Sequence, residues 1–154
     1  MFKQFKNYKE NKMKSSIFIL FVLLLIFSSC SVYSQKGWGP GSNYNKIYDV
    51  NTVETIGGQV TKIDKIYPDK NMSYGIHLTI NTSSGEISVH LGPGWYIENQ
   101  DIQINADDNV TVTGSKVTYD GSKVIIAKEV TKGDQILKLR DDNGYPLWSG
   151  WRNR

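Results

Sequence analysis

Cysteine and histidine are scarce in this chain of 154 residues, which holds one cysteine, Cys30, and two histidines, His77 and His90. Because Cys30 lies close to the amino terminus, the rest of the chain can form neither an internal disulfide nor a thiolate metal site. No G-x-S-x-G, H-E-x-x-H or phosphate-binding glycine loop is present. These absences argue against an enzyme and favour a binding or interaction protein.

No apolar run is long enough to cross a membrane as a helix. The apolar stretch at residues 17–27 contains eleven residues, whereas a spanning helix needs about 20. Five lysines precede this stretch and small residues follow it at positions 28–31. A basic, then apolar, then small-residue order is typical of a secretory signal. We therefore predict that residues 1–34 form a signal peptide and that the protein is exported.

The cleavage site has two readings. Phe27-Ser28-Ser29-Cys30 resembles a relaxed bacterial lipobox, in which the cysteine becomes the lipidated first residue. The alternative is cleavage after Ser34, which would release a soluble protein beginning at Gln35. We favour the first reading. It predicts a protein that is lipid-anchored through Cys30 to a bacterial envelope membrane, whereas the second predicts a periplasmic or secreted one.

Positive charge is concentrated in the signal segment. Residues 1–34 contain five lysines and one glutamate, a net charge of +4. Residues 35–154 contain thirteen Lys plus Arg and fourteen Asp plus Glu, a net charge of −1. A nucleic-acid-binding domain usually carries a basic footprint. We therefore expect no nucleic-acid partner.

The segment 35–52 is rich in Gly, Ser and Asn and has no hydrophobic periodicity, so we predict a linker, on which Trp38 and Tyr44 are candidates for docking on the domain. Residues 53–154 then form the domain. Alternating apolar residues and turn signals predict strands within it at 55–66, 73–81, 86–91, 109–119, 123–130 and 135–140. Residues 95–100 suit one helical turn.

Three strands, a helical turn and then two strands joined by a tight hairpin is the order of the OB-fold. We therefore predict an all-β domain, a small five- to six-stranded OB-fold-like barrel with a short helical turn between strands 3 and 4. Within it, Val60, Ile63 and Ile66 are expected core residues of the first strand. A small sandwich and a lipocalin-like barrel are the alternatives, although the latter wants about eight strands.

The most distinctive segment is HLGPGWY at residues 90–96, followed by VTGS at 112–115, AKEV at 127–130 and PLW at 146–148. Over residues 55–150 this pattern resembles the domain of the MamS/MamX family of magnetosome proteins, and it is also similar to bacterial periplasmic OB-fold proteins. The resemblance implies a small exported domain without a defined ligand. MamX-type proteins carry haem-attaching C-x-x-C-H motifs. This chain has none, which argues against electron transfer.

The two histidines fall opposite each other if Ser83-Ser84 form a two-residue hairpin loop. In that register Leu78 faces Val89 and Ile76 faces Leu91, so the apolar faces match. His77 and His90 are then cross-strand neighbours and could share a metal ion such as zinc or copper. The alternative is a polar pair on the outer face of the sheet, without any cofactor.

The loop Gly92-Pro93-Gly94-Trp95-Tyr96 is the second candidate site. Glycine and proline fix the exit from the third strand, and the two aromatic rings could stack on a ligand or partner. Alternatively, Trp95 closes the end of the barrel. We expect a structural Trp95 and a more exposed Tyr96. The acidic pairs 107–108 and 141–142 lie beside turns, where we expect them to cap backbone amides.

Together these features predict an exported, membrane-anchored, non-enzymatic binding or interaction module of the bacterial envelope. Its partner would be an envelope protein or a small ligand of unknown identity. The alternative function is a periplasmic metal-handling protein that uses the cross-strand pair of His77 and His90.

Overall fold

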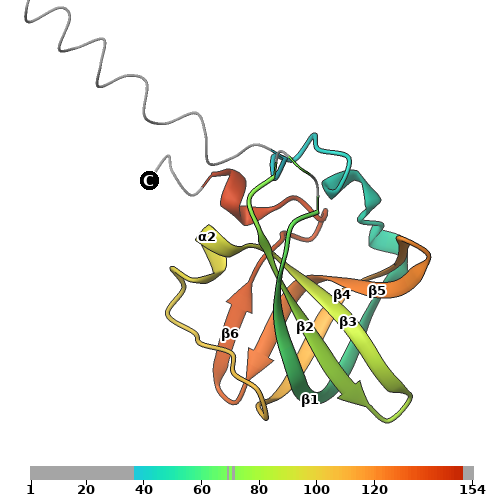
Figure 1. Ribbon diagram of the computed structural model, residues 1–154, viewed down its shortest axis with the longest axis vertical. Coiled ribbons are helices and arrows are strands. Elements are labelled where there is room, and N and C mark those ends of the chain that lie inside the picture. Colours follow the sequence, from blue (N-terminus) through green and yellow to red (C-terminus); the bar gives the residue numbers. More distant parts are fainter. Residues whose placement is uncertain (1–36, 69, 71, 151–154) are drawn as a thin grey trace, which may run out of the picture. The chain divides into compact units, whose positions relative to one another are not determined.

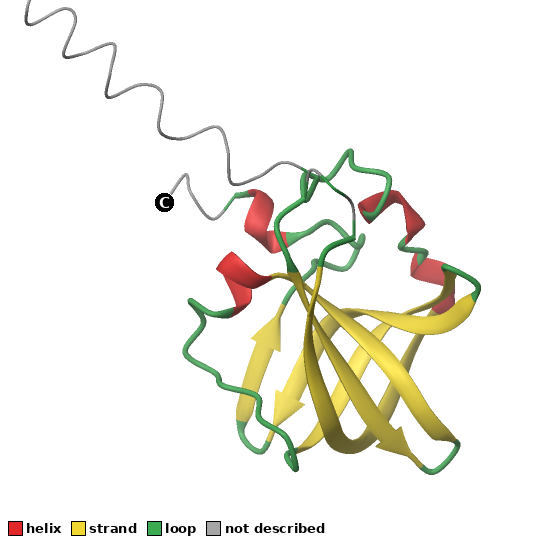
Figure 2. Ribbon diagram, viewed as in Figure 1, coloured by secondary structure: helices red, strands yellow, loops and turns green. Residues whose placement is uncertain are grey.

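The computed structural model describes residues 37–68, 70 and 72–150. The predicted signal segment and Cys30 lie outside the described residues. Six strands dominate the fold (Figures 1 and 2), and the regular elements in chain order are η1 (Asn45–Ile47), η2 (Val50–Thr52), β1 (Val53–Ile66), β2 (Gly75–Thr82), β3 (Gly85–Pro93), α2 (Gly94–Ile97), β4 (Asn109–Tyr119), β5 (Ser122–Lys132), β6 (Gln135–Lys138) and η3 (Leu147–Ser149).

The strands form one sheet that closes on itself. Their order is β3-β2-β1-β4-β5-β6, with antiparallel neighbours, and a parallel pairing of β3 with β5 completes the ring. The tight β2–β3 and β4–β5 hairpins and the position of α2 between β3 and β4 match the predicted strand order. The prediction of an all-β, OB-fold-like barrel with a sixth strand at its edge is confirmed.

Strand β1 changes partner half-way along its length. Residues 53–59 pair with β4, and residues 59–66 pair with β2 on the opposite edge, with an irregularity between Val60 and Lys62. Among the described strands, each half of β1 therefore has a partner on one edge only. Val60 is fully buried, but Ile63 and Ile66 are 38% and 40% exposed. The expectation that both belong to the core was wrong, because this half of β1 extends past the end of β4.

The expected linker is part of the fold from residue 37 onward. Trp38, Tyr44 and Asn45 are almost completely buried, so docking of the two aromatic residues is confirmed and an unpacked linker over 37–52 is corrected. These two buried rings supply the apolar contacts that hold this Gly- and Ser-rich stretch on the domain. The carboxyl-terminal segment lies against the same region, because Trp148 Nε1 donates a 2.8 Å hydrogen bond to the Trp38 carbonyl.

Arg140 joins the two terminal segments. Its guanidinium is buried and donates to the carbonyl of Gly144 at 3.1 Å and to Oδ1 of Asn45 at 2.8 Å. The rings of Tyr48 and Trp148 lie about 5 Å from its central carbon, a cation–π arrangement that offsets lost hydration. Burial lowers the pKa of Arg140 to about 10, so it stays charged at neutral pH. We call Trp38, Tyr44, Asn45, Arg140 and Trp148 the terminal clasp.

The clasp rests on glycines of the sheet. A Cβ atom at Gly75 would lie 2.7 Å from Cη2 of Trp38, and one at Gly92 would lie 2.8 Å from Cζ3 of Trp148. These approaches are closer than van der Waals contact permits. The rings of Trp38 and Trp148 meet edge to face, with their centroids 6.3 Å apart. Their positions therefore require glycine, which has no side chain, at these points of β2 and β3.

We predict that Gly75→Ala lowers the free energy of unfolding by about 1–3 kcal/mol, the usual cost of overpacking. Gly57→Ala is the matched control, since a Cβ there would meet nothing closer than 3.9 Å and alanine suits a strand better than glycine. Urea unfolding of both variants checks this. Equal stabilities of the two variants would contradict the packing argument.

Candidate functional site

The two histidines lie opposite each other, as the hairpin register predicts. His77 pairs with His90, Leu78 with Val89 and Ile80 with Ile87. The register shifts between Ile76 and His77, so Ile76 faces Gly92 and not Leu91, which corrects that part of the prediction. The two imidazoles stack with their centroids 3.6 Å apart and their planes at 16°.

The histidine pair is buried beneath the terminal clasp. His77 and His90 are 9% and 3% exposed, because Tyr44 stacks over His90 and hydrogen bonds to its Nδ1 at 2.9 Å. Tyr119 meets the His90 ring edge to face. The pair lies on the outer side of the sheet, as the alternative expects, but it is not exposed there, because Tyr44 of the segment 37–52 covers it.

Burial also sets the charge of the pair. It lowers the pKa of His77 to about 4, with Asp64 on β1 opposing the shift. It lowers the pKa of His90 to about 3, and the neighbouring His77 adds to that shift. Both rings are therefore neutral at pH 7. His77 Nε2 is buried and has no hydrogen-bond partner. No hydrogen bond therefore offsets the loss of hydration of this nitrogen, and His77 contributes to the fold through its stacked ring.

Stacking is unsuited to a shared metal ion. Imidazole ligands bind through lone pairs that lie in the ring plane, at about 2.0–2.1 Å for zinc. Lone pairs in two nearly parallel planes 3.6 Å apart do not converge, so zinc or copper would require at least one ring to turn. In the described part of the chain, no group of three or more His, Cys, Asp or Glu side chains is placed to hold a metal.

The Gly-Pro-Gly-Trp-Tyr loop is mostly built into the fold. Gly92, Pro93, Gly94 and Tyr96 are buried, whereas Trp95 is half-buried. The expectation that Tyr96 is the more exposed of the two rings was wrong. Tyr96 lies in α2, and its ring packs 5.8 Å from the Trp148 ring, so the carboxyl-terminal segment covers it.

The acidic pairs act at turns, as expected. Asp141 Oδ1 accepts hydrogen bonds from the amides of Asn143 and Tyr145 at 3.0 and 2.8 Å. Asp108 Oδ2 accepts from the Asn105 amide and pairs with Lys132 at 2.7 Å. Their partners are turn amides and a surface lysine, which is a structural arrangement.

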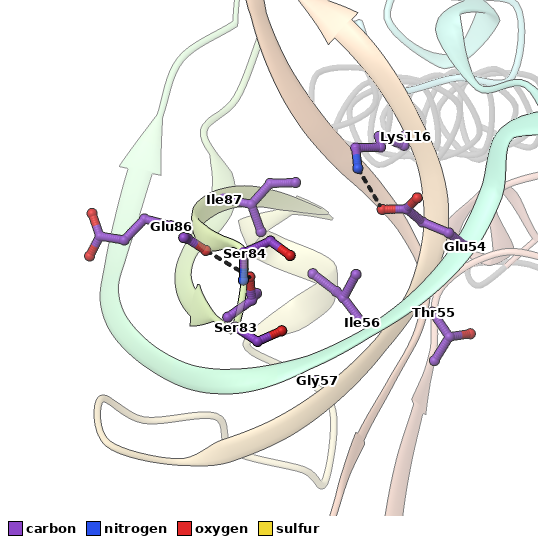
Figure 3. A pocket seen from close by; sticks show the side chains of 11 residues that line it. Glu54, Thr55, Ile56, Gly57, Ser83, Ser84, Glu86, Ile87 and Lys116 are labelled. Carbon is purple, nitrogen blue, oxygen red and sulfur yellow. Dashed lines mark hydrogen bonds and ion pairs between the residues drawn. The ribbon is translucent and has the colours of Figure 1, made fainter.

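An open groove lies between β1 and the β2–β3 hairpin (Figure 3). It opens where β1 and β2 separate, beyond the pair Gln59–Asn81, and it has a volume of about 470 Å³. Its walls are residues 54–57 of β1, residues 82–87 of the β2–β3 hairpin, and Lys116 of β4. Sequence reasoning missed this groove; the only local sign is the doubled glycine at 57–58, where the two strands part.

The groove combines an apolar base with a polar rim. Ile56 and Ile87 are half-buried and pack against the core, and both point toward the groove in Figure 3. Glu54 and Lys116 form a 3.0 Å ion pair at one side. The hairpin wall is braced by Thr82, whose hydroxyl donates to the Gly85 carbonyl at 2.7 Å and accepts from the Ser84 amide at 3.1 Å. The wall is thus formed before any ligand arrives.

A smaller apolar cleft of about 170 Å³ lies beside the other half of β1. Its lining includes Ile63, Ile97 and Leu137, and its rim carries Lys65 and Glu98. These two charges pair at 2.8 Å, and the Tyr74 hydroxyl donates to Glu98 at 2.7 Å. The two cavities therefore follow the two edges of β1 that no described strand pairs with.

A family model for the MamS/MamX magnetosome protein family matches residues 52–137. The chain belongs to this family. The matched range contains β1 to β5, most of β6, both histidines and the whole groove. The clasp residues of this MamS/MamX family member lie outside the matched range. The clasp is therefore formed by the segments that precede and follow the family domain.

Two solved structures are similar to the chain. One is the dimeric structure of the N-terminal domain of PriB from Thermoanaerobacter tencongensis, at 14% identity and a TM-score of 0.38, covering 55% of this chain and 99% of that one. The other is the S. pombe Stn1-ten1 complex, at 17% identity and a TM-score of 0.40, covering 76% and 88%. No curated protein matches the chain. Within the described residues, no helix has the length and apolarity to cross a membrane.

The histidine stack predicts a specific loss of stability in acid. Both folded-state pKa values lie below the ordinary 6.5, so the unfolded chain binds protons more readily. The contribution is complete above about pH 6.5 and is lost as the pH falls toward 4 and 3. His77→Phe keeps a ring in the stack and removes a proton site, so we expect unchanged stability at pH 7 and a shallower decline between pH 6 and 4.

His90→Phe is the matched comparison. It removes the hydrogen-bond partner of the buried Tyr44 hydroxyl, so we expect a loss of about 1–3 kcal/mol at pH 7. Urea titrations of both variants at several pH values give the measurement. The interpretation fails if His77→Phe declines in acid as steeply as the unmodified protein.

Proposed function

We propose that this protein is an exported, lipid-anchored, non-enzymatic binding module of the bacterial envelope, and that the groove between β1 and the β2–β3 hairpin is its binding site. The observation that carries the proposal is the groove itself, a preformed hollow of about 470 Å³ with an apolar base and a charged rim. Its lining combines the apolar side chains of Ile56 and Ile87 with serine, threonine and charged residues, so it offers a ligand both apolar contact and hydrogen-bonding groups.

The chemistry of the groove favours binding without catalysis. Its lining contains serine and threonine hydroxyls but neither histidine nor cysteine. The two histidines of the chain are buried, and Tyr44 hydrogen bonds to His90. The groove serines, Ser83 and Ser84, lie at least six residues along the hairpin from either histidine, which is roughly 20 Å at about 3.3 Å per residue. A serine nucleophile needs a general base within hydrogen-bond reach, and no imidazole meets this condition.

The groove also favours a ligand other than a nucleic acid. Its ionisable lining residues are Glu54, Glu86 and Lys116, which together carry a net negative charge. None of its lining residues is aromatic. Single-stranded nucleic acids are bound by cationic grooves with aromatic stacking platforms, and this groove offers the opposite charge.

The amino-terminal part of the described chain lies far from the groove. Trp38 packs at Gly75, the first residue of β2, whereas the groove lies at its last residue, Thr82. Eight residues of strand place these points roughly 23 Å apart. The segment around Trp38 and the groove therefore lie at opposite ends of β2.

We predict that Cys30→Ser moves the protein out of the membrane fraction or leaves the precursor uncleaved, because a multiply acylated cysteine anchors firmly and serine cannot be acylated in this way. Fractionation and intact-mass measurement of the mature protein check this. A mature protein that begins at Gln35 would contradict lipid anchoring while leaving the groove proposal intact.

The groove proposal is tested by photo-crosslinking in living cells. A benzophenone amino acid at Ser83, on the hairpin wall, should give a discrete adduct under ultraviolet light. The same amino acid at Asp134, an exposed residue of the β5–β6 turn outside the groove, is the control. Adducts that are absent at Ser83, or identical at both positions, would overturn the groove as the binding site.

A further inference from the structure

We propose that the ligand of the groove is an extended segment of a partner polypeptide, which adds to the sheet as a strand along the free edge of β1 at residues 53–58. This inference rests on the proposed function and names the chemical class of its ligand. Three observations carry it: the unpaired strand edge, the shape of the opening, and the chemistry of its walls.

The first observation is the backbone of β1. Residues 53–58 pair with β4 on one edge, and β2 pairs with β1 only from Gln59 onward. In an antiparallel pair, alternate residues direct their N–H and C=O groups toward the partner and the others direct them away. About three of these six residues therefore present backbone donors and acceptors along the groove side, spaced as a further strand requires.

The second observation is the fork between β1 and β2. The two strands are held together at Gln59–Asn81 and separate beyond it, and the hairpin at residues 82–87 forms the far wall of the opening. The free edge of six residues is about 20 Å long. A single extended chain entering the fork would continue the ladder of β2 on β1, with the hairpin wall beside it (Figure 3).

The third observation is the alternation of environments that such a chain would meet. Ile56 and Ile87 form the apolar base, and Ser83 and Ser84 are exposed on the wall. Side chains of a strand alternate between two faces, so alternate apolar residues of the partner would rest on the isoleucines. Glu86 is exposed, and Lys116 already neutralises Glu54, which favours a basic residue at one end of the bound segment.

The edge also has few of the features that protect edge strands. Natural edges are blocked by proline, lysine, bulges or extreme shortness. Residues 53–58 read VETIGG and contain no proline and no lysine. The irregularity of β1 lies beyond them, at Val60 to Lys62. This edge is therefore open to main-chain pairing.

The test uses a display library of random nine-residue peptides, selected on the full-length protein. Enriched peptides are resynthesised with a single N-methyl group at each position in turn, which removes one amide donor at a time. We expect a loss of affinity of tenfold or more at every second position and near-normal affinity between them. This period of two reports main-chain pairing, which side-chain recognition alone does not produce.

A matched pair of variants locates the site. Ser84→Trp fills the groove and should weaken the enriched peptides at least tenfold, whereas Asp134→Trp, at the exposed β5–β6 turn outside the groove, should not. Failure to enrich any peptide, N-methyl losses without a period of two, or equal binding by both variants would each overturn strand addition. If the Ser83 crosslink persists in any of these cases, the groove remains a binding site and only the ligand class is wrong.

Discussion

The length of β1 is the constraint on which the rest of the molecule depends. β1 has fourteen residues and is longer than either neighbouring strand. Its first half therefore pairs with β4 and its second half with β2. This division lets the sheet curve until β3 meets β5 in parallel. It also leaves two lengths of unpaired edge, and a cavity lies beside each. Closure of the ring and the presence of the groove are thus two results of the same mismatch in strand length.

The most distinctive sequence and the most open surface are in different places. The Gly-Pro-Gly-Trp-Tyr loop is used to seat aromatic rings, because its glycines let Trp148 and Tyr74 approach the backbone. The groove is made of ordinary residues such as Ser83, Ser84 and Glu86. The distinctive Gly-Pro-Gly-Trp-Tyr motif is therefore explained by the close packing of aromatic rings on the backbone. The candidate binding surface depends instead on the point where β1 and β2 stop pairing.

The sequence predicted what depends on short-range periodicity. The alternation over residues 75–91 defines the β2–β3 hairpin and correctly opposes His77 and His90. It could not reveal Tyr44 above that pair, because the contact joins residues 46 positions apart from a segment without a pattern. The same reason applies to Tyr96, whose burial depends on Trp148, and to Ile63, whose exposure depends on where β4 begins. Long-range contacts decided each of these outcomes.

The clasp also brings the entrance and exit of the fold together. The Trp38 carbonyl accepts a hydrogen bond from the Trp148 indole, and Asn45 meets Arg140, so the polypeptide leaves the domain close to where it entered. Domains with neighbouring ends can be inserted into a loop of another protein or circularly permuted with little disturbance. This domain therefore has the geometry of a cassette: a short linker joining its ends would allow the chain to be opened instead at the exposed β4–β5 turn around Gly121.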